Sequence, residues 1–471
     1  MILLPSRYLV RIPVKINKKP YFIVYHSLFG GALRINKIVW NLIQKFKDGK
    51  DFPRYFSKGD ISAYRDTILF LRKRYFLVKK GIDERSKWED LCAIDAKEVS
   101  AGQYIRNLRL EMASYCNFSC AHCFAPKIYV WKKGKKMSFV TAKLAIDGFI
   151  DILKKSGAKK GEITFWGGEP LLNWEVIKKI VEYVNVATKK SAINIKFGIC
   201  TNGSLLNDQI LKFMKLHKIG ALVSLDGFEK ENDSFRKFIN GKGTFKSIIK
   251  AMEGLNKYGI RFNVEISLND YNFYSIEKII EFVHNRYKKS ISFIVQVIYF
   301  QKTTPSFDHH SNQEKAKRLM EIFCYFRKKR RNYSINPSGG INLLNNAQKL
   351  GVVPHNCTGL FNALYVNTSG LVYNCQQLTI PLGTVKHMER ITQGKNYKHI
   401  AMRCAGRMIK GCKGCEIEGL CSGGCAGIVL FYSGDVYNTS HPLFRSFYCD
   451  FQRNLLRELL KQCPGYLDFK K

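Results

Sequence analysis

Three closely spaced cysteines constrain this chain more than any other feature. Cys116, Cys120 and Cys123 share one short segment, which follows an alternating apolar run from Leu108 to Met112. Three thiolates on one loop can ligate three irons of a four-iron cluster and leave the fourth iron without a protein ligand. A structural zinc site requires a fourth Cys or His at similar spacing, and His122 lies between two of the cysteines, where it is poorly placed to complete the tetrahedron. The spacing therefore favours a cluster with one open iron.

The bulk composition indicates a cytoplasmic globular protein. The 471 residues allow two or three domains. No stretch approaches the roughly 18 unbroken apolar residues of a membrane span, and the N-terminal sequence lacks the regions of a signal peptide. We therefore expect no membrane partner. In the reducing cytosol, 15 cysteines favour metal ligation over disulfides.

The charge balance is strongly basic. Lys and Arg outnumber Asp and Glu by 77 to 37, which gives a formal charge of +40 and suggests nucleic acid or an acidic peptide as a partner. The basic residues are, however, spread along the whole chain, with only short clusters such as those at 132–136 and 328–331. A solvated basic surface explains this spread equally well. We therefore do not expect nucleic acid as the partner.

Residues 1–95 have the element order of a winged helix. The predicted elements are strands at 8–14 and 21–25, helices at 36–46 and 60–72, and a closing strand at 75–79. The unit is either a partner-binding module or a structural wing without a ligand. The polar residues 81–90 are predicted to be the linker that follows it.

From residue 107 to about residue 297 the chain repeats a strand-then-helix pattern that predicts a parallel α/β sheet with crossover helices. The predicted strands are 108–112, 162–166, 193–200, 221–225, 262–267 and 291–297. The predicted helices between them are 138–155, 174–186, 208–217, 244–258 and 274–286. A helical bridge is expected over 311–350, with a helix at 312–330.

Polar motifs follow the predicted strands where each one ends. Gly167, Gly168 and Glu169 follow the second strand; glycines let a backbone approach a ligand closely, and a carboxylate there can accept hydrogen bonds from an ammonium group. Asn202 follows the third strand, and the segment from Ser224 to Asp226 follows the fourth. For these last polar residues, simple turns after strands remain the alternative.

A second group of cysteines lies near the C-terminus. Its members are Cys357, Cys375, Cys412, Cys415, Cys421, Cys425 and Cys449. Seven ligands exceed what one tetrahedral zinc site can use, so the group favours iron–sulfur clusters. Two structural zinc sites remain the alternative.

Together, these motifs resemble the radical S-adenosylmethionine (SAM) enzymes that carry a SPASM domain, notably the maturases of ribosomally made, post-translationally modified peptides (RiPPs). The resemblance covers nearly the whole chain from Asn107 onward. It implies a partial (β/α)6 TIM-like barrel at 104–310, with the chemistry at the carboxyl ends of the strands. It also implies an N-terminal winged-helix-like domain at 1–95, which binds a leader peptide, and a Cys-rich SPASM domain at 351–471.

The resemblance also implies roles for the motif residues. The open iron would chelate the amino and carboxylate groups of SAM, while Gly167, Gly168 and Glu169 would hold its amino group. The remaining implied SAM contacts are Asn202, Ser224 and Asp226 with the ribose and carboxylate, Arg236 with the carboxylate, and His122 with the adenine. Asn232 stands where many relatives have a histidine, which weakens any role for it.

Carried over by position, the C-terminal cysteines divide into two auxiliary clusters. Cys412, Cys415, Cys421 and Cys449 would hold one [4Fe–4S] cluster. Cys357, Cys375 and Cys425 would supply three ligands of the other, whose fourth iron is either open or bound by Cys404 or His355.

The function implied is reductive cleavage of SAM to a 5'-deoxyadenosyl radical, which abstracts hydrogen from a residue of a precursor peptide. The expected partners are that precursor with its leader and an external one-electron reductant of the flavodoxin or ferredoxin type. The alternatives are an anaerobic sulfatase-maturing (formylglycine-forming) enzyme and a nucleic-acid-binding iron–sulfur protein. The sequence indicates neither the bond formed nor the residue that returns hydrogen to the substrate.

Overall fold

The structure is a computed structural model. It describes residues 2–16, 18–47, 49, 58–123, 134–189, 192–287, 290–297, 310–328, 334–337, 343, 346–347, 349–352, 357–403 and 409–462. Within these ranges no helix has both the length and the apolar character needed to cross a bilayer.

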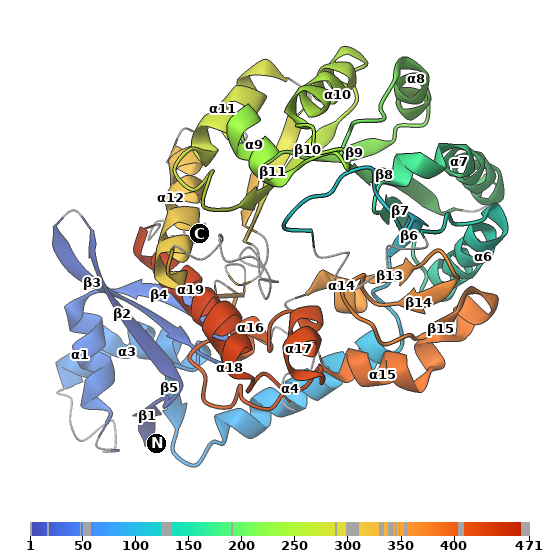
Figure 1. Cartoon of the computed structure of the whole chain (residues 1–471). Coiled ribbons are helices and arrows are strands. Elements are labelled where there is room, and N and C mark those ends of the chain that lie inside the picture. Colours follow the sequence, from blue (N-terminus) through green and yellow to red (C-terminus); the bar gives the residue numbers. More distant parts are fainter. Residues whose placement is uncertain are drawn as a thin grey trace.

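A parallel sheet forms the centre of the molecule. Its predicted strands are β6 (Asn107–Ala113), β7 (Lys160–Gly167), β8 (Asn194–Thr201), β9 (Gly220–Ser224), β10 (Phe262–Leu268) and β11 (Ser290–Val297). Each pairs in parallel with the next one along the chain. Figure 1 shows these strands as an open arc with helices around its outside. The predicted partial barrel is therefore confirmed, including all six strands.

The helices around the arc form where apolar residues recur at helical spacing. They are α6 (Phe139–Lys155), α7 (Trp174–Thr188), α8 (Asp208–Leu216), α9 (Glu229–Phe235), α10 (Phe245–Lys257) and α11 (Ile276–Arg286). In α6, the Ser138 side chain caps the first turn by accepting a hydrogen bond from the Thr141 amide, and Ile146, Phe149 and Leu153 are buried against the sheet. Only the short α9 was not predicted.

The central sheet continues beyond the predicted strands on both sides. β12 (Ser334–Pro337) pairs in parallel with β11, within the region predicted to be only helical. On the other side β13 (Ala363–Val366) pairs in parallel with β6, and β14 (Leu371–Tyr373) and β15 (Gly383–Thr384) follow in antiparallel order. The C-terminal region therefore covers the open edge of the first barrel strand.

A buried carboxylate reinforces this junction. Glu111 of β6 is 2% exposed and accepts hydrogen bonds from the Tyr365 hydroxyl (2.9 Å) and the Thr368 amide (2.9 Å). Burial raises the pKa of Glu111. The barrel and the cysteine-rich region thus share one sheet and one buried polar network.

The elements that follow the barrel are short, apart from the bridge helix α12 and the last helix α19, which pack against each other. They are α12 (Asn312–Lys328), α14 (Thr358–Phe361), η4 (Val385–Gln393), α15 (Lys395–Met402), α16 (Glu418–Cys421), α17 (Ala426–Ser433), α18 (Pro442–Phe444), η6 (Arg445–Cys449) and α19 (Asp450–Gln462). The short turn η2 (Pro170–Asn173) lies in the barrel. The contact of α12 with α19 attaches the bridge to the C-terminal region.

The N-terminal unit contains the predicted elements and two further strands. Its sheet consists of β2 (Leu9–Ile16), β3 (Lys19–His26) and β4 (Gly30–Ile35) in that order, while β1 (Leu3–Pro5) pairs with β5 (Leu77–Lys79). The helices α1 (Lys37–Lys45) and α3 (Lys58–Lys73) pack on the sheet through a separate apolar core. β1 and β4 were not predicted.

The linker predicted at 81–90 is largely wrong, because residues from Glu84 onward form the helix α4 (Glu84–Ser100). The boundary predicted at residue 95 therefore falls inside a helix. Trp88 of α4 is fully buried with Leu28 and Phe29 of the N-terminal unit. The polar pattern that suggested a linker comes from the exposed face of α4.

Ion pairing fixes α4 to the cysteine-rich region. Two nitrogens of Arg85 donate to the Glu418 carboxylate at 3.2 and 2.5 Å, and Glu418 is 4% exposed. Nearby, the Gly419 amide donates to the Ser27 carbonyl at 2.9 Å. The N-terminal unit is thus docked on the C-terminal region through buried contacts.

We predict that Arg85→Leu lowers the free energy of unfolding by about 3 kcal/mol, because it leaves the buried Glu418 carboxylate without its cationic partner. Arg286→Leu, which removes an exposed pair with Glu253 at 2.7 Å, is the matched control and should cost less than about 1 kcal/mol. Urea titration measures both values. Equal losses would mean that the Arg85 pair does not hold the two regions together.

Candidate active site and cysteine clusters

The three-cysteine loop begins just after β6 ends. Burial raises the pKa of Cys116 to about 12, with a further contribution from the charge of Glu169, and it raises the pKa of Cys120 to about 11. The charge of Cys123 raises both pKa values further, so the three thiols lie within electrostatic reach of one another. Buried neighbouring thiols become thiolates most readily when a metal centre binds them. This arrangement fits the ligand set of a cluster.

The Gly-Gly-Glu motif at the end of β7 packs directly against this loop. A side chain at Gly168 would place its Cβ 2.1 Å from the Tyr115 carbonyl oxygen and 2.8 Å from the Cys116 nitrogen. The preceding Gly167 has a φ of +136°, which a residue with a side chain rarely adopts. Both glycines are therefore required for the close approach of the motif to the cysteine loop.

Glu169 is fully buried where the strands end. Its carboxylate accepts hydrogen bonds from the Leu171 amide (3.0 Å), the Thr201 hydroxyl (2.7 Å) and the Asn202 amide (2.8 Å). Burial raises its pKa to about 7 despite these three donors. The carboxylate thus joins the carboxyl ends of β7 and β8 next to the cysteine loop, although no contact with Thr201 was predicted.

Asn202 connects the end of β8 to the cysteine loop, while its expected contact with SAM stays a prediction. Its side-chain amide donates to the Asn117 side-chain oxygen at 2.8 Å and lies 3.6 Å from the Cys116 sulfur. Asn117 in turn donates to the Ser204 hydroxyl at 2.9 Å. Sequence analysis missed Asn117, which lies within the three-cysteine motif, and Ser204, which lies two residues after Asn202.

Asp226 and Arg236 form a buried pair that sequence analysis did not predict. The guanidinium donates to both oxygens of the carboxylate at 2.7 and 3.0 Å, and the Ser267 amide donates to one of them at 2.8 Å. Burial alone would raise the pKa of Asp226, but the charge of Arg236 and these hydrogen bonds hold it below its usual value. Arg236 also hydrogen-bonds to Cys120 and lowers its pKa against the effect of burial.

This pairing gives Asp226 and Arg236 a positioning role beside the cysteine loop. The contacts expected between these residues and SAM remain predictions. Ser224, at the end of β9, is half-buried, and its expected SAM contact is a prediction too. Asn232 is fully buried and bonds to the Asp226 amide and the Thr244 hydroxyl, which is a structural role.

His122 belongs to the cysteine loop, and its side chain faces the Asp226 carboxylate. Its Nε2 is 3.6 Å from an Asp226 oxygen, which is too far for a good hydrogen bond. Burial lowers the pKa of His122 to about 4, so the ring is neutral. Its Nδ1 is buried, with no hydrogen-bond partner among the described residues. An unpartnered buried nitrogen fits a ligand with a polar ring edge at this position.

Four C-terminal cysteines gather around one cavity. Cys412, Cys415, Cys421 and Cys449 all line it. Burial raises the pKa of Cys421 well above its usual value, and the charges of the other three thiols raise it further. The structure therefore brings together the four cysteines predicted to share one auxiliary cluster.

Three further cysteines form a second group. Burial raises the pKa of Cys425 to about 12, and the charges of Cys357 and Cys375 raise it further. Cys404 and His355, the two residues considered as a fourth ligand, lie outside the described residues. The predicted division into groups of four and three is reproduced, while ligation itself remains a proposal.

The thiols in these groups do not converge on a single point. Among the residues that the structure describes, no three His, Cys, Asp or Glu side chains are arranged to hold one metal ion. A zinc ion would bind its thiolate sulfurs at about 2.3 Å, whereas a cubane presents a separate iron to each thiolate. Metal analysis of the protein distinguishes the two.

A parallel partial barrel with a cysteine loop and buried polar motifs at its strand ends defines an enzyme scaffold. The profile of the radical SAM superfamily matches residues 110–283. The radical SAM cyclopropyl synthase TigE of Paramaledivibacter caminithermalis is 24% identical over 481 aligned positions, covering 98% of this chain and 96% of the relative. The chain therefore contains a radical SAM domain and is a radical SAM enzyme, as predicted, and SAM and a four-iron cluster are the cofactors of such enzymes.

Two other relatives define the range of the similarity. A cysteine-type anaerobic sulfatase-maturating enzyme of Clostridium perfringens is 24% identical over 328 positions, covering 66% of this chain and 86% of the relative. The crystal structure of Streptococcus suis SuiB bound to the precursor peptide SuiA superposes with a TM-score of 0.55 and 13% identity, covering 94% of this chain and all of that one. The chain is thus related to both kinds of maturase.

The pKa of Glu169 generates a prediction about SAM binding. We expect the Glu169 carboxylate to accept the ammonium group of SAM, and only the charged carboxylate binds a cation. As the pH is raised toward 7, the affinity for SAM should therefore increase by up to tenfold per pH unit, and above pH 7 it should level off. Calorimetric titration of the reconstituted enzyme between pH 5.5 and 7.5 measures this dependence.

Glu169→Gln should bind SAM weakly and lose this pH dependence. Glu162→Gln, at an exposed glutamate of the same strand, should retain the wild-type profile. A wild-type affinity that does not vary with pH would remove Glu169 from this role.

Proposed function

We propose that this chain is a radical SAM peptide maturase that modifies a residue of a ribosomally made precursor peptide. Cys116, Cys120 and Cys123 would hold a four-iron cluster, which would supply the one-electron chemistry that cleaves SAM to methionine and a hydrogen-abstracting 5'-deoxyadenosyl radical. One observation supports the peptide substrate above all. A separate N-terminal unit with an open sheet edge is docked on the cysteine-rich region of this radical SAM enzyme.

The chain's own residues position the cofactor and exclude water. The Glu169 carboxylate accepts the ammonium group of SAM, and Gly168 allows the motif backbone to reach the cysteine loop. The pair of Asp226 with Arg236 holds the guanidinium against Cys120. Neutral, buried His122 offers a ring face and an unused nitrogen to the adenine. Burial of these groups keeps water from the reactive radical.

The cysteine groups support one SAM-binding and two auxiliary [4Fe–4S] clusters. Anaerobically reconstituted protein should contain about twelve irons per chain. Cys116→Ala and Cys421→Ala should each lower that number by about four, because each removes a ligand of a different cluster. Cys92→Ala, at a buried cysteine outside all three groups, is the control and should leave the iron content unchanged.

Metal analysis by mass spectrometry distinguishes the outcomes. Bound zinc that follows the same cysteines, with no deoxyadenosine formed after reduction, would overturn the cluster assignment. Loss of iron in the Cys92 variant would mean that the counts reflect misfolding.

The N-terminal sheet has one edge suited to an added peptide strand. The outer edge of β2 carries Pro13, which has no N–H to donate, and α19 packs against this strand. On β4, Gly30 and Gly31 pair with the segment at 349–350. In the described part of the chain, no strand pairs with the rest of the outer edge of β4, residues 32–35.

Exposed apolar side chains lie beside this open edge. Leu69 and Phe70 of α3 are 49% and 45% exposed. Arg74 stacks on Phe70 and donates to the Gly31 carbonyl at 3.3 Å, which places the end of α3 beside β4. A leader peptide added to β4 would gain backbone hydrogen bonds and cover these apolar groups.

We predict that Leu69→Asp combined with Phe70→Asp weakens binding of the precursor leader at least about tenfold, because burying one large apolar side chain contributes about 1.5–3 kcal/mol. Fluorescence anisotropy with the labelled leader of the precursor encoded beside this gene measures it. Val186→Asp, at an exposed apolar residue of α7, is the control and should leave the affinity unchanged.

The sulfatase-maturing alternative rests on the match to the Clostridium perfringens enzyme, which covers 66% of this chain. That function predicts formylglycine in a sulfatase-derived peptide and no effect of the α3 substitutions. The similarity to TigE instead covers 98% of this chain, including the N-terminal unit, and therefore favours the peptide maturase.

A further inference from the structure

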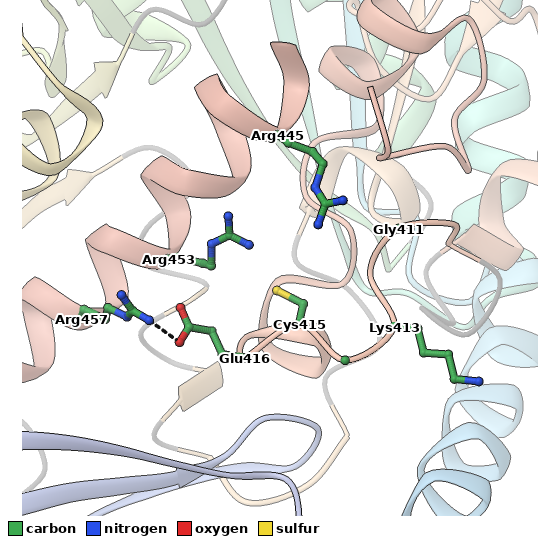
Figure 2. A pocket seen from close by; sticks show the side chains of 8 residues that line it. Gly411, Lys413, Cys415, Glu416, Arg445, Arg453 and Arg457 are labelled. Atoms are coloured by element: carbon green, nitrogen blue, oxygen red, sulfur yellow. Dashed lines mark hydrogen bonds and ion pairs between the residues drawn. The ribbon is translucent and has the colours of Figure 1, made fainter. Parts of the chain in front are cut away.

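An open pocket of about 390 Å³ lies beside the four-cysteine group. Figure 2 shows that its wall includes Lys413, Cys415, Glu416, Arg445, Arg453 and Arg457. The three arginines come from η6 and α19, whereas the other three residues belong to the cysteine segment. No role in the proposed function requires four cationic side chains here.

The charges around this pocket are not balanced locally. Arg457 pairs with Glu416 at 2.7 Å, and Arg453 pairs with Asp450. Lys413 and Arg445 are exposed and form no ion pair within the described residues. The mouth of the pocket therefore keeps two positive charges available for an acidic partner.

The pocket and the inner cavity of the four-cysteine group share part of their lining. Cys415, Arg445 and Arg453 line both the pocket and the inner cavity that contains all four cysteines. A partner seated in the pocket would thus contact a ligand of the proposed cluster directly. The +40 charge of the whole chain attracts acidic molecules to any part of the surface. At this pocket, however, the exposed cations lie beside a ligand of the proposed cluster.

We propose that this pocket is the docking site of an acidic one-electron carrier protein. The inference rests on the proposed function, because it requires a cluster on Cys412, Cys415, Cys421 and Cys449. The reduced carrier gives one electron to that cluster, which passes from the 2+ to the 1+ state, and no covalent bond forms or breaks. With flavodoxin hydroquinone as the carrier, the anionic hydroquinone becomes the neutral semiquinone, and no proton is taken up or released.

An acidic segment of the precursor peptide is the competing occupant. An acidic peptide would bind the positive charge of the pocket, but its binding would not depend on the cluster ligand Cys415 in the pocket lining. An electron carrier needs both the positive charge and the nearby cluster, since complementary charge orients the two proteins and electron transfer requires close approach to the redox centre.

The test uses the double variant Lys413→Glu with Arg445→Glu, which reverses the two unpaired cations. Lys230→Glu with Lys250→Glu, at exposed lysines of α9 and α10, is the matched control. Surface plasmon resonance measures the Kd of an acidic flavodoxin for the iron-loaded enzyme at low and at high salt. We expect the Kd to rise at least about tenfold in the pocket variant at low salt and less than twofold in the control.

A second readout connects docking with electron delivery. The ratio of flavodoxin-driven to dithionite-driven deoxyadenosine formation should fall about tenfold in the pocket variant, because dithionite needs no docking site. An unchanged Kd and ratio would overturn the proposal. Weaker binding of the leader with unchanged flavodoxin binding would also overturn it and assign the pocket to the peptide.

Failure of the proposed function gives a different result. In that case, dithionite-driven deoxyadenosine or leader binding would be missing in the wild type. Iron content checks each variant, and a pocket variant that loses about four irons is replaced by Lys413→Gln with Arg445→Gln. That pair removes the two charges without adding acidic groups beside the thiolates.

Discussion

The buried carboxylate of Glu169 is the interaction on which the rest of the site depends. It has no solvent to stabilise its charge, and three donors from η2 and the end of β8 surround it. Those donors bring neighbouring strand ends to one point, and Gly168 then brings the cysteine loop to the same point. Burial raises the pKa of Glu169, so its charged form would be stabilised by a cationic ligand. The ammonium group of SAM is such a ligand.

The three regions of the chain act as one frame around that point. β13 supplies the edge partner of β6, so the cysteine-rich region continues the barrel sheet. α4 carries Trp88 into the N-terminal unit and Arg85 onto Glu418 of the cysteine-rich region. A leader bound at β4 would therefore be held on a body that also fixes the auxiliary cysteines, and the distance to the barrel would stay constant.

Arginine side chains occupy two different kinds of environment in this chain. Buried Arg236 lowers the pKa of the Cys120 thiol, whereas Arg445 and Arg457 in the wall of the pocket beside Cys415 are exposed. The same guanidinium group thus serves two purposes, depending on its burial. When buried and paired it positions a ligand, and when exposed it can meet an acidic surface.

The sequence by itself determined the cysteine spacing, the Gly-Gly-Glu motif and the six barrel strands, because each depends on local pattern or short periodicity. It also predicted the division of the distant cysteines, through resemblance to a known family. Only the tertiary structure decided that Arg236 bonds to Asp226, that β13 closes the edge of β6 and that residues 84–100 form a docked helix. The first two features join residues that are far apart in the chain, and the third depends on which face of a polar segment is buried. The spacing of neighbouring residues in the sequence indicates neither.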